Sequence, residues 1–93
     1  MTLEFDWDSD KAYRNFRKHD ITFNEGATVF GDSLAATFPD PDHSVGEQRF
    51  ITIGLSNQNK VLVVSHTDRL GRIRIISVRR ATRQERRFYE EEQ

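Results

Sequence analysis

The chain has 93 residues, of which 35% are hydrophobic and 31% charged, with no cysteine and a formal net charge of −1. Two domains would each be too small for a hydrophobic core, so we expect residues 1–93 to form a single domain. The lack of cysteine excludes disulfides and thiolate metal sites and favours a reducing compartment. No stretch approaches the ~20 apolar residues of a membrane span, so we expect a soluble, cytoplasmic protein.

Charge is unevenly distributed along the chain. Residues 1–59 hold five Lys and Arg against ten Asp and Glu, whereas residues 60–93 hold nine against five. The segment 69–87 has eight arginines and one acid, a formal +7. Such asymmetry is typical of a protein with one side facing a polyanion. The alternative is a solvated surface whose arginines pair with the acids of the first half.

The N-terminal part predicts a short strand followed by a helix. Residues 3–7 alternate apolar and polar side chains, which is typical of a strand with one buried face. Asp8 can cap a helix that runs to His19. Acids in the first turn of this helix and bases in its last turn both favour the helix dipole.

Two capping boxes predict where two further helices begin. They are Thr22 with Glu25, and Thr82 with Glu85. The first opens a short helix that Gly31 ends. The second opens a helix that runs to the C-terminus, with Phe88 and Tyr89 as its only large apolar residues. Two apolar residues barely stabilise a helix in isolation. This helix is therefore expected to dock on the sheet or on another chain.

Four strands are predicted between these helices. They cover residues 33–38, 50–55, 60–66 and 73–78. Prolines end the first of them, and an acidic loop follows over residues 40–49. The remaining connections are short, so the four strands should pair as an antiparallel meander. The predicted fold class is a small α+β domain of order β-α-α-β-β-β-β-α, with the helices on one face of an antiparallel sheet.

Several sequence blocks resemble the BrnT family of toxins. The blocks are RKHDITFNEGATVFGD, FPDPDHSVGEQRF, ITIGLS and HTDRLGRIRIISVRRATRQERRFYEE, and they cover nearly the whole chain in the same order. One departure is Asp20, which stands where the family often has glycine after the histidine of the first helix. Asp20 must then adopt the left-handed conformation itself, which aspartate tolerates better than most residues.

This resemblance implies a RelE-like fold and the function of a ribonuclease that arrests translation as the toxin of a type II toxin–antitoxin pair. The implied partner is a BrnA-type antitoxin, whose ribbon-helix-helix part represses the shared operon. The toxin would thus reach operator DNA only through the antitoxin. RNA is the implied substrate, free or on the ribosome, and no cofactor is expected.

RNA cleavage without a metal needs a base for the 2′-hydroxyl, cations for the phosphorane and an acid for the leaving 5′-oxygen. We predict that Arg74, Arg79 and Arg80 clamp the phosphate and that His66, at a strand end, transfers protons. Regular alternation places Arg72 and Arg74 on one side of the last strand and Arg79 on the other.

Further RNA contacts are predicted for Lys18, Arg69, Arg72, Arg83 and Tyr89. Each candidate has a structural alternative: the arginines can pair with acids or contact the antitoxin, Tyr89 can pack the last helix, and His66 can be a polar strand end. His43, in the acidic loop, has no partner at metal-ligand spacing, so no metal site is expected.

Two classes of function remain open at this point. The first is an endoribonuclease toxin. The second is a non-catalytic RelE-like module that binds the antitoxin and supports operon autoregulation. When the chain is expressed alone, the first class predicts growth arrest and RNA cleavage, and the second predicts neither. Direct DNA binding is disfavoured, because the sequence contains no recognition-helix pattern.

Overall fold

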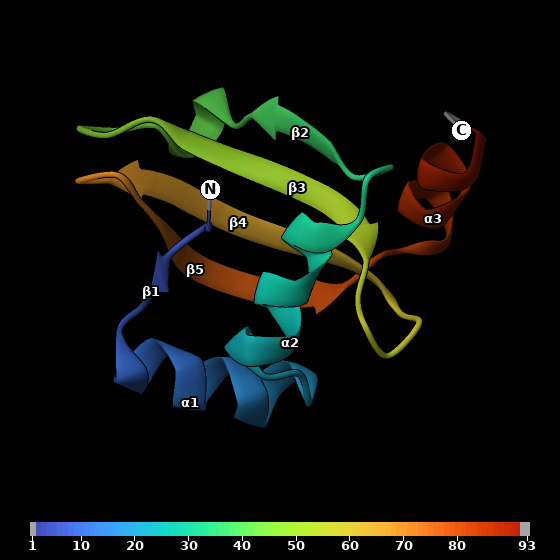
Figure 1. Ribbon diagram of the computed structural model, residues 1–93, viewed down its shortest axis with the longest axis horizontal. Helices are drawn as coiled ribbons and strands as arrows, with labels where there is room; N and C mark the ends of the chain where they lie inside the picture. Colours follow the sequence, from blue (N-terminus) through green and yellow to red (C-terminus); the bar gives the residue numbers. More distant parts are fainter. Residues whose placement is uncertain (1, 92–93) are drawn as a thin grey trace.

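The computed structural model describes residues 2–91 and follows the predicted order of elements (Figure 1). The strands are β1 (Phe5–Asp6), β2 (Ala36–Pro39), β3 (Arg49–Leu55), β4 (Val61–Arg69) and β5 (Arg72–Arg80), and the helices are α1 (Ser9–His19), α2 (Phe23–Thr28) and α3 (Arg83–Glu91). Short 3-10 turns, η1 (Val29–Gly31) and η2 (Pro41–His43), follow α2 and β2.

The five strands form one sheet in the order β1-β5-β4-β3-β2. Strands β2 to β5 pair antiparallel, which confirms the predicted meander. The prediction of a wholly antiparallel sheet was wrong at one edge, where β1 runs parallel to β5 with Phe5 opposite Ile73. This strand is also shorter than predicted, and Leu3, which we expected in it, is 53% exposed. The sheet is therefore mixed and mostly antiparallel.

A β-bulge interrupts the pairing of β4 with β5. His66 lies opposite Ile75 and Ser65 lies opposite Ser77, so Ile76 is an extra residue on β5. An extra residue in one strand changes which side chains face each side of the sheet beyond it. The residues of β5 before Ile76 and those after it therefore do not follow one regular alternation between the two faces of the sheet.

The bulge places two of the predicted site arginines on the same face. Arg74 lies opposite Thr67 and Arg79 lies opposite Val63. Thr67 and Val63 are four residues apart in β4, the strand without the extra residue, so their side chains share a face. The predicted placement of Arg74 and Arg79 on opposite sides was wrong, because simple alternation does not include the bulge.

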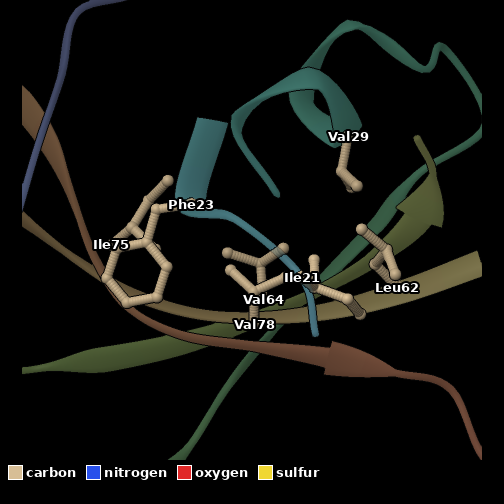
Figure 2. Close-up of a cluster of buried hydrophobic side chains, with 7 residues drawn as sticks. All are labelled: Ile21, Phe23, Val29, Leu62, Val64, Ile75 and Val78. Atoms are coloured by element: carbon tan, nitrogen blue, oxygen red, sulfur yellow. The ribbon is translucent and has the colours of Figure 1, made fainter. Parts of the chain in front are cut away.

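The main hydrophobic core lies between the sheet and helices α1 and α2. Its buried side chains come from β4, β5 and the segment 21–29, and Figure 2 shows them gathered between these elements. They are Ile21, Phe23, Val29, Leu62, Val64, Ile75 and Val78. Phe5 and Trp7 pack against this cluster from the N-terminal segment, as predicted. The opposite face of strands β3, β4 and β5 is called the open face below.

Helix α3 packs on the open face, away from α1 and α2 (Figure 1). Its Tyr89 forms a second buried cluster with Ile53, Val61 and Val63. Since Val61 and Val63 alternate along β4 with the main-core residues, the two clusters lie on opposite faces of the sheet. The prediction that all helices lie on one face was wrong for α3, whereas its predicted docking on the sheet is confirmed.

Local capping interactions set the ends of the helices much as the sequence predicts. The Asp8 carboxylate accepts hydrogen bonds from the backbone N–H groups of Asp10 and Lys11 at the start of α1. Asp20 ends α1 in the left-handed conformation, with φ of 58°. These two residues therefore fix the length of α1 from local interactions alone.

The two capping boxes differ in how fully they form. In the second box, the Thr82 hydroxyl and the Glu85 carboxylate each accept the other residue's backbone N–H. In the first box Thr22 caps Glu25, but the buried Glu25 carboxylate instead accepts a hydrogen bond from Ser56. Glu25 therefore ties α2 to the end of β3.

Helix α1 is attached to β5 by a buried asparagine. Asn15 donates to the carbonyl of Val78 at 2.8 Å and accepts from its N–H at 3.0 Å. These two hydrogen bonds satisfy the backbone carbonyl and N–H of Val78, on the part of the β5 edge that the short strand β1 does not reach.

Among residues 2–91, no helix has the length and apolar character needed to cross a lipid bilayer.

Candidate functional site

A cleft of about 320 Å³ lies on the open face, between the sheet and the loop that joins β2 to β3. It is lined by Asp40, His43, Arg49, Ile51, Ser65, Ile76, Ser77 and Arg79. The lining side chains come from β3, β4, β5 and the loop, so a rigid sheet forms the floor. Its two arginines and small hydroxyl side chains suit a ligand with negatively charged oxygen atoms.

Arg79 enters the cleft from β5 beyond the bulge. Its Nη1 and Nη2 donate to Glu85 Oε1 and Oε2 at 2.7 and 2.9 Å. These hydrogen bonds raise the pKa of Arg79 above its ordinary value, so the guanidinium stays charged. They also lower the pKa of Glu85 to about 2. The Arg79 side chain remains 40% exposed, so it has donors left for a ligand.

Arg49 is the second cation of the cleft, and it was not predicted as a site residue. It lies at the start of β3, opposite Thr67 on β4, and its Nε is 3.7 Å from Glu47 Oε1. The same glutamate carboxylate is 3.2 Å from Arg69 Nη2. Glu47 therefore holds two arginines near one end of the open face.

Arg72 and Arg74 extend the positive charge along the open face toward β1. Arg74 Nη1 lies 3.3 Å from Asp6 Oδ1 and is about one quarter exposed (28%). Arg72 is exposed, stands opposite Arg69 in the strand register, and has no ion-pair partner among residues 2–91. The open face thus carries a row of arginines that starts in the cleft and runs along β5.

Five of the predicted residues lie elsewhere: Arg80, Lys18, Arg83, Tyr89 and His66. Arg80 stands opposite Leu62 and so projects on the helix-covered face. Lys18 is exposed in the last turn of α1, a helix on that same face. Arg83 is exposed at the start of α3. Tyr89 is buried and its hydroxyl donates to Asp32 at 2.5 Å, so it attaches α3 to the body of the molecule.

His66 lies on the helix-covered face and is only 5% exposed. Its ring meets Phe30 edge to face and stacks on Phe50, and its Nε2 lies 2.7 Å from Thr52 Oγ1. Burial lowers the pKa of His66, against the raising effect of Asp68, which favours a neutral ring. A neutral imidazole closed off from solvent and from the cleft does not fit proton transfer to a bound RNA.

The cleft contains a different histidine, His43. Its Nδ1 lies 2.9 Å from Asp40 Oδ2, and both residues line the cleft with Arg79. From the sequence we considered His43 only as a metal ligand. The three-residue spacing of Asp40 and His43 was a usable signal, because residues so spaced meet within one helical turn.

A second hollow, of about 280 Å³, lies beside Asp32 between η1 and the end of β3. Thr28, Gly31, Leu55, Ser56 and Asn57 complete its lining, which contains no cation. Asp32 itself is anionic: burial raises its pKa, but hydrogen bonds from Tyr89 and from the backbone of Leu55 and Leu34 outweigh burial and leave the pKa lowered. This hollow therefore does not suit a polyanion.

Comparison with known proteins gives a family and a fold. A family model described as the ribonuclease toxin BrnT of type II toxin–antitoxin systems matches residues 7–85. The crystal structure of the ribonuclease toxin BrnT from Brucella abortus has a TM-score of 0.69 and 24% identity to this chain, covering 88% of this chain and 100% of that one. At this identity the likeness shows that the two chains share a fold. No curated protein matched the sequence.

Proposed function

The chain belongs to the BrnT family of ribonuclease toxins of type II toxin–antitoxin systems, and on this premise we propose that it is an endoribonuclease whose RNA lies in the cleft of the open face. The observation that carries the proposal is that Arg49, from β3, and Arg79, from β5, both line this cleft. Both guanidiniums can donate two hydrogen bonds to one phosphate.

The row of arginines outside the cleft supports a polymeric substrate. Arg72 and Arg74 lie on the same face as Arg79 because of the bulge at Ile76, and Arg69 lies there by regular alternation along β4. A single phosphate needs only one or two cations, whereas RNA presents a phosphate at every nucleotide. The row therefore extends the binding surface for nucleotides that flank the scissile bond.

The chemistry we propose is attack of the ribose 2′-oxygen on the adjacent phosphorus, without a metal. Arg49 and Arg79 neutralise the charge that grows on the phosphoryl oxygens in the transition state. In this role the arginines stabilise the transition state more than the ground state. Cleavage of messenger RNA in the cytoplasm, free or on the ribosome, would arrest translation.

As a type II toxin the chain acts with a protein antitoxin, and we propose one of the BrnA, ribbon-helix-helix type. The antitoxin type rests on the family resemblance. We also propose that residues 1–93 act as one toxin domain, because all described elements pack on a single sheet. Any operator binding would then come from the antitoxin.

The test is cleavage of a defined RNA by purified protein, mapped by primer extension with and without ribosomes. We expect wild type to cut and the double variant Arg49→Ala/Arg79→Ala to lose at least about 100-fold in rate. Arg14→Ala is the matched control, because Arg14 is an exposed arginine on α1, across the sheet from the cleft. Thermal unfolding of each variant checks that its fold is intact.

Each outcome has a definite reading. Cuts by wild type and Arg14→Ala, lost in the double variant, support the proposal. Undiminished cutting by the double variant places the active site elsewhere. An intact wild-type protein that cuts nothing under either condition would instead indicate the non-catalytic module that binds the antitoxin.

A further inference from the structure

The loop between β2 and β3 is held in one shape by its own hydrogen bonds. The Ser44 hydroxyl donates to the Asp40 carbonyl at 2.7 Å and accepts from the Arg49 N–H at 3.0 Å. The backbone N–H of Asp40 donates to the Arg49 carbonyl at 2.8 Å, which extends the β2–β3 pairing by one residue. Asp40 is therefore fixed beside the first residue of β3.

Asp40 in turn orients the imidazole of His43. The distance of 2.9 Å between Asp40 Oδ2 and His43 Nδ1 is that of a hydrogen bond. When a carboxylate accepts a hydrogen bond from Nδ1–H of a neutral imidazole, Nε2 of that ring is left as the proton acceptor. The Asp40 side chain is 14% exposed and the His43 side chain 68%. The Asp40 carboxylate is thus mostly buried, whereas the His43 imidazole is accessible to a ligand.

The other charged groups of the cleft suit this arrangement. Arg49 faces it from β3 and Arg79 from β5, and the acids paired with these arginines are Glu47 and Glu85. Asp40 is the remaining charged group of the lining. A phosphate held by the arginines would bring the neighbouring ribose into the cleft that His43 borders.

We propose that His43 is the general base for RNA cleavage in this cleft and that Asp40 is its positioning residue. The Nε2 atom of His43 takes the proton of the ribose 2′-hydroxyl as the 2′-oxygen forms a bond to phosphorus. The bond from phosphorus to the 5′-oxygen breaks, and the leaving oxygen takes a proton from solvent water. The hydroxide so formed takes the proton from His43 Nε2, which restores the neutral ring. The products are a 2′,3′-cyclic phosphate and a 5′-hydroxyl. This inference rests on the proposed function and specifies which groups act in it.

The first test compares His43→Ala with wild type on the same RNA. We expect kcat to fall by about 10²–10⁴-fold, the usual contribution of general acid–base catalysis. Free imidazole added to His43→Ala should restore part of the rate, because it can accept the proton in the vacated space. His19→Ala is the matched control: His19 ends α1 on the far side of the sheet, and its variant should cut as wild type does.

The second test distinguishes a role of Asp40 in positioning His43 from a role in binding RNA. Asp40→Asn keeps the size of the side chain but removes the charge that selects the Nδ1–H tautomer. We expect kcat to fall by at least about tenfold with KM changed by less than about twofold. Imidazole should not rescue this variant, because His43 still fills the space. Loss of the arginines, in contrast, is expected to raise KM as well.

The third test is the dependence of kcat on pH. Wild-type kcat should rise with pH as the general base loses its proton, and this rise should be absent in His43→Ala. Analysis of the RNA ends then identifies the cyclic phosphate and the 5′-hydroxyl.

The outcomes separate this inference from the proposed function. If wild type cuts RNA and folded His43→Ala cuts it equally well, the inference is wrong and the ribonuclease remains. Cuts that leave a 5′-phosphate would also overturn it, because attack by the 2′-oxygen cannot give that product. If wild type cuts nothing, both the inference and the proposed function fail.

Discussion

Arg79 and Glu85 are joined by two parallel hydrogen bonds, of 2.7 and 2.9 Å. Glu85 also accepts the backbone N–H of Thr82 at 2.9 Å, and so caps helix α3. One carboxylate therefore both starts the last helix and holds a cation of the cleft. A phosphate that binds the remaining donors of Arg79 lies near this carboxylate, whose negative charge opposes its binding.

The first prediction is that Glu85→Gln binds RNA more tightly than wild type. The amide keeps an oxygen for the cap but removes the negative charge that competes with phosphate. We expect the Kd for a 2′-O-methyl RNA, which cannot be cut, to fall about threefold to fivefold, as for a partly exposed ion pair. Fluorescence anisotropy measures it. Glu90→Gln, an exposed acid on α3, is the control for net charge alone. Equal tightening in both variants would contradict a specific role for Glu85.

The second prediction concerns stability in acid. Hydrogen bonds from Arg79 and, to a smaller extent, from Thr82 lower the pKa of Glu85 from 4.5 to about 2. A carboxylate with a lowered pKa adds stability above its unfolded value, and this is lost as pH falls from about 4.5 toward 2. Because solvent screens this partly exposed pair, we expect a loss of about 1 kcal/mol. Urea unfolding at several pH values measures it, and Glu85→Gln should lack this part of the dependence. If the stability of Glu85→Gln falls with pH as steeply as that of wild type, the prediction is refuted.

The third prediction follows from the burial of His66. The folded protein disfavours the charged imidazole, so its pKa lies below the unfolded value of 6.5. The unfolded chain then binds more protons, and stability is full above about pH 6.5 and declines as pH falls below it. His66→Gln should be less sensitive than wild type between about pH 7.5 and 5.5, measured by urea unfolding. An identical decline in both proteins would show that another group is responsible.

The fourth prediction is that Tyr89→Phe loosens helix α3. The variant keeps the buried ring but removes the hydroxyl that donates to Asp32 at 2.5 Å. Asp32 then loses one of the hydrogen bonds that favour its charged form. We expect the free energy of unfolding to fall by about 1.5–3 kcal/mol, the usual range for a hydrogen bond to a charged group. Hydrogen exchange should speed up in α3 more than in β4. Uniform acceleration across both elements would argue against a local role.

The helix boundaries could be predicted because their signals are local. Asp8, Thr22 and Thr82 cap backbone groups within three residues of themselves, so a short stretch of sequence contains the whole interaction. The meander was predictable for the same reason, since its connections are short. The parallel pairing of Phe5 with Ile73 joins residues far apart in the chain, and no local pattern indicates it.

The candidate site was less predictable, because it depends on packing. The sequence correctly indicated a basic last strand, but not that α3 covers the face opposite α1. Nor did it distinguish buried His66 from exposed His43: burial of His66 depends on Phe30 and Phe50 of other elements. Loop 40–48 lacks the periodicity by which strands and helices are recognised, so its place beside Arg79 became visible only in the fold.

The extra residue at Ile76 also affects how sequences of relatives should be aligned. A relative that lacks one residue between Arg74 and Val78 could keep every arginine of this strand in the alignment. If the residues after the gap kept their core positions, the residues before the gap would then face the other side of the sheet. An alignment that treats a one-residue gap here as neutral would equate arginines that face opposite sides. Gaps at this position should therefore be counted as changes in the charged surface.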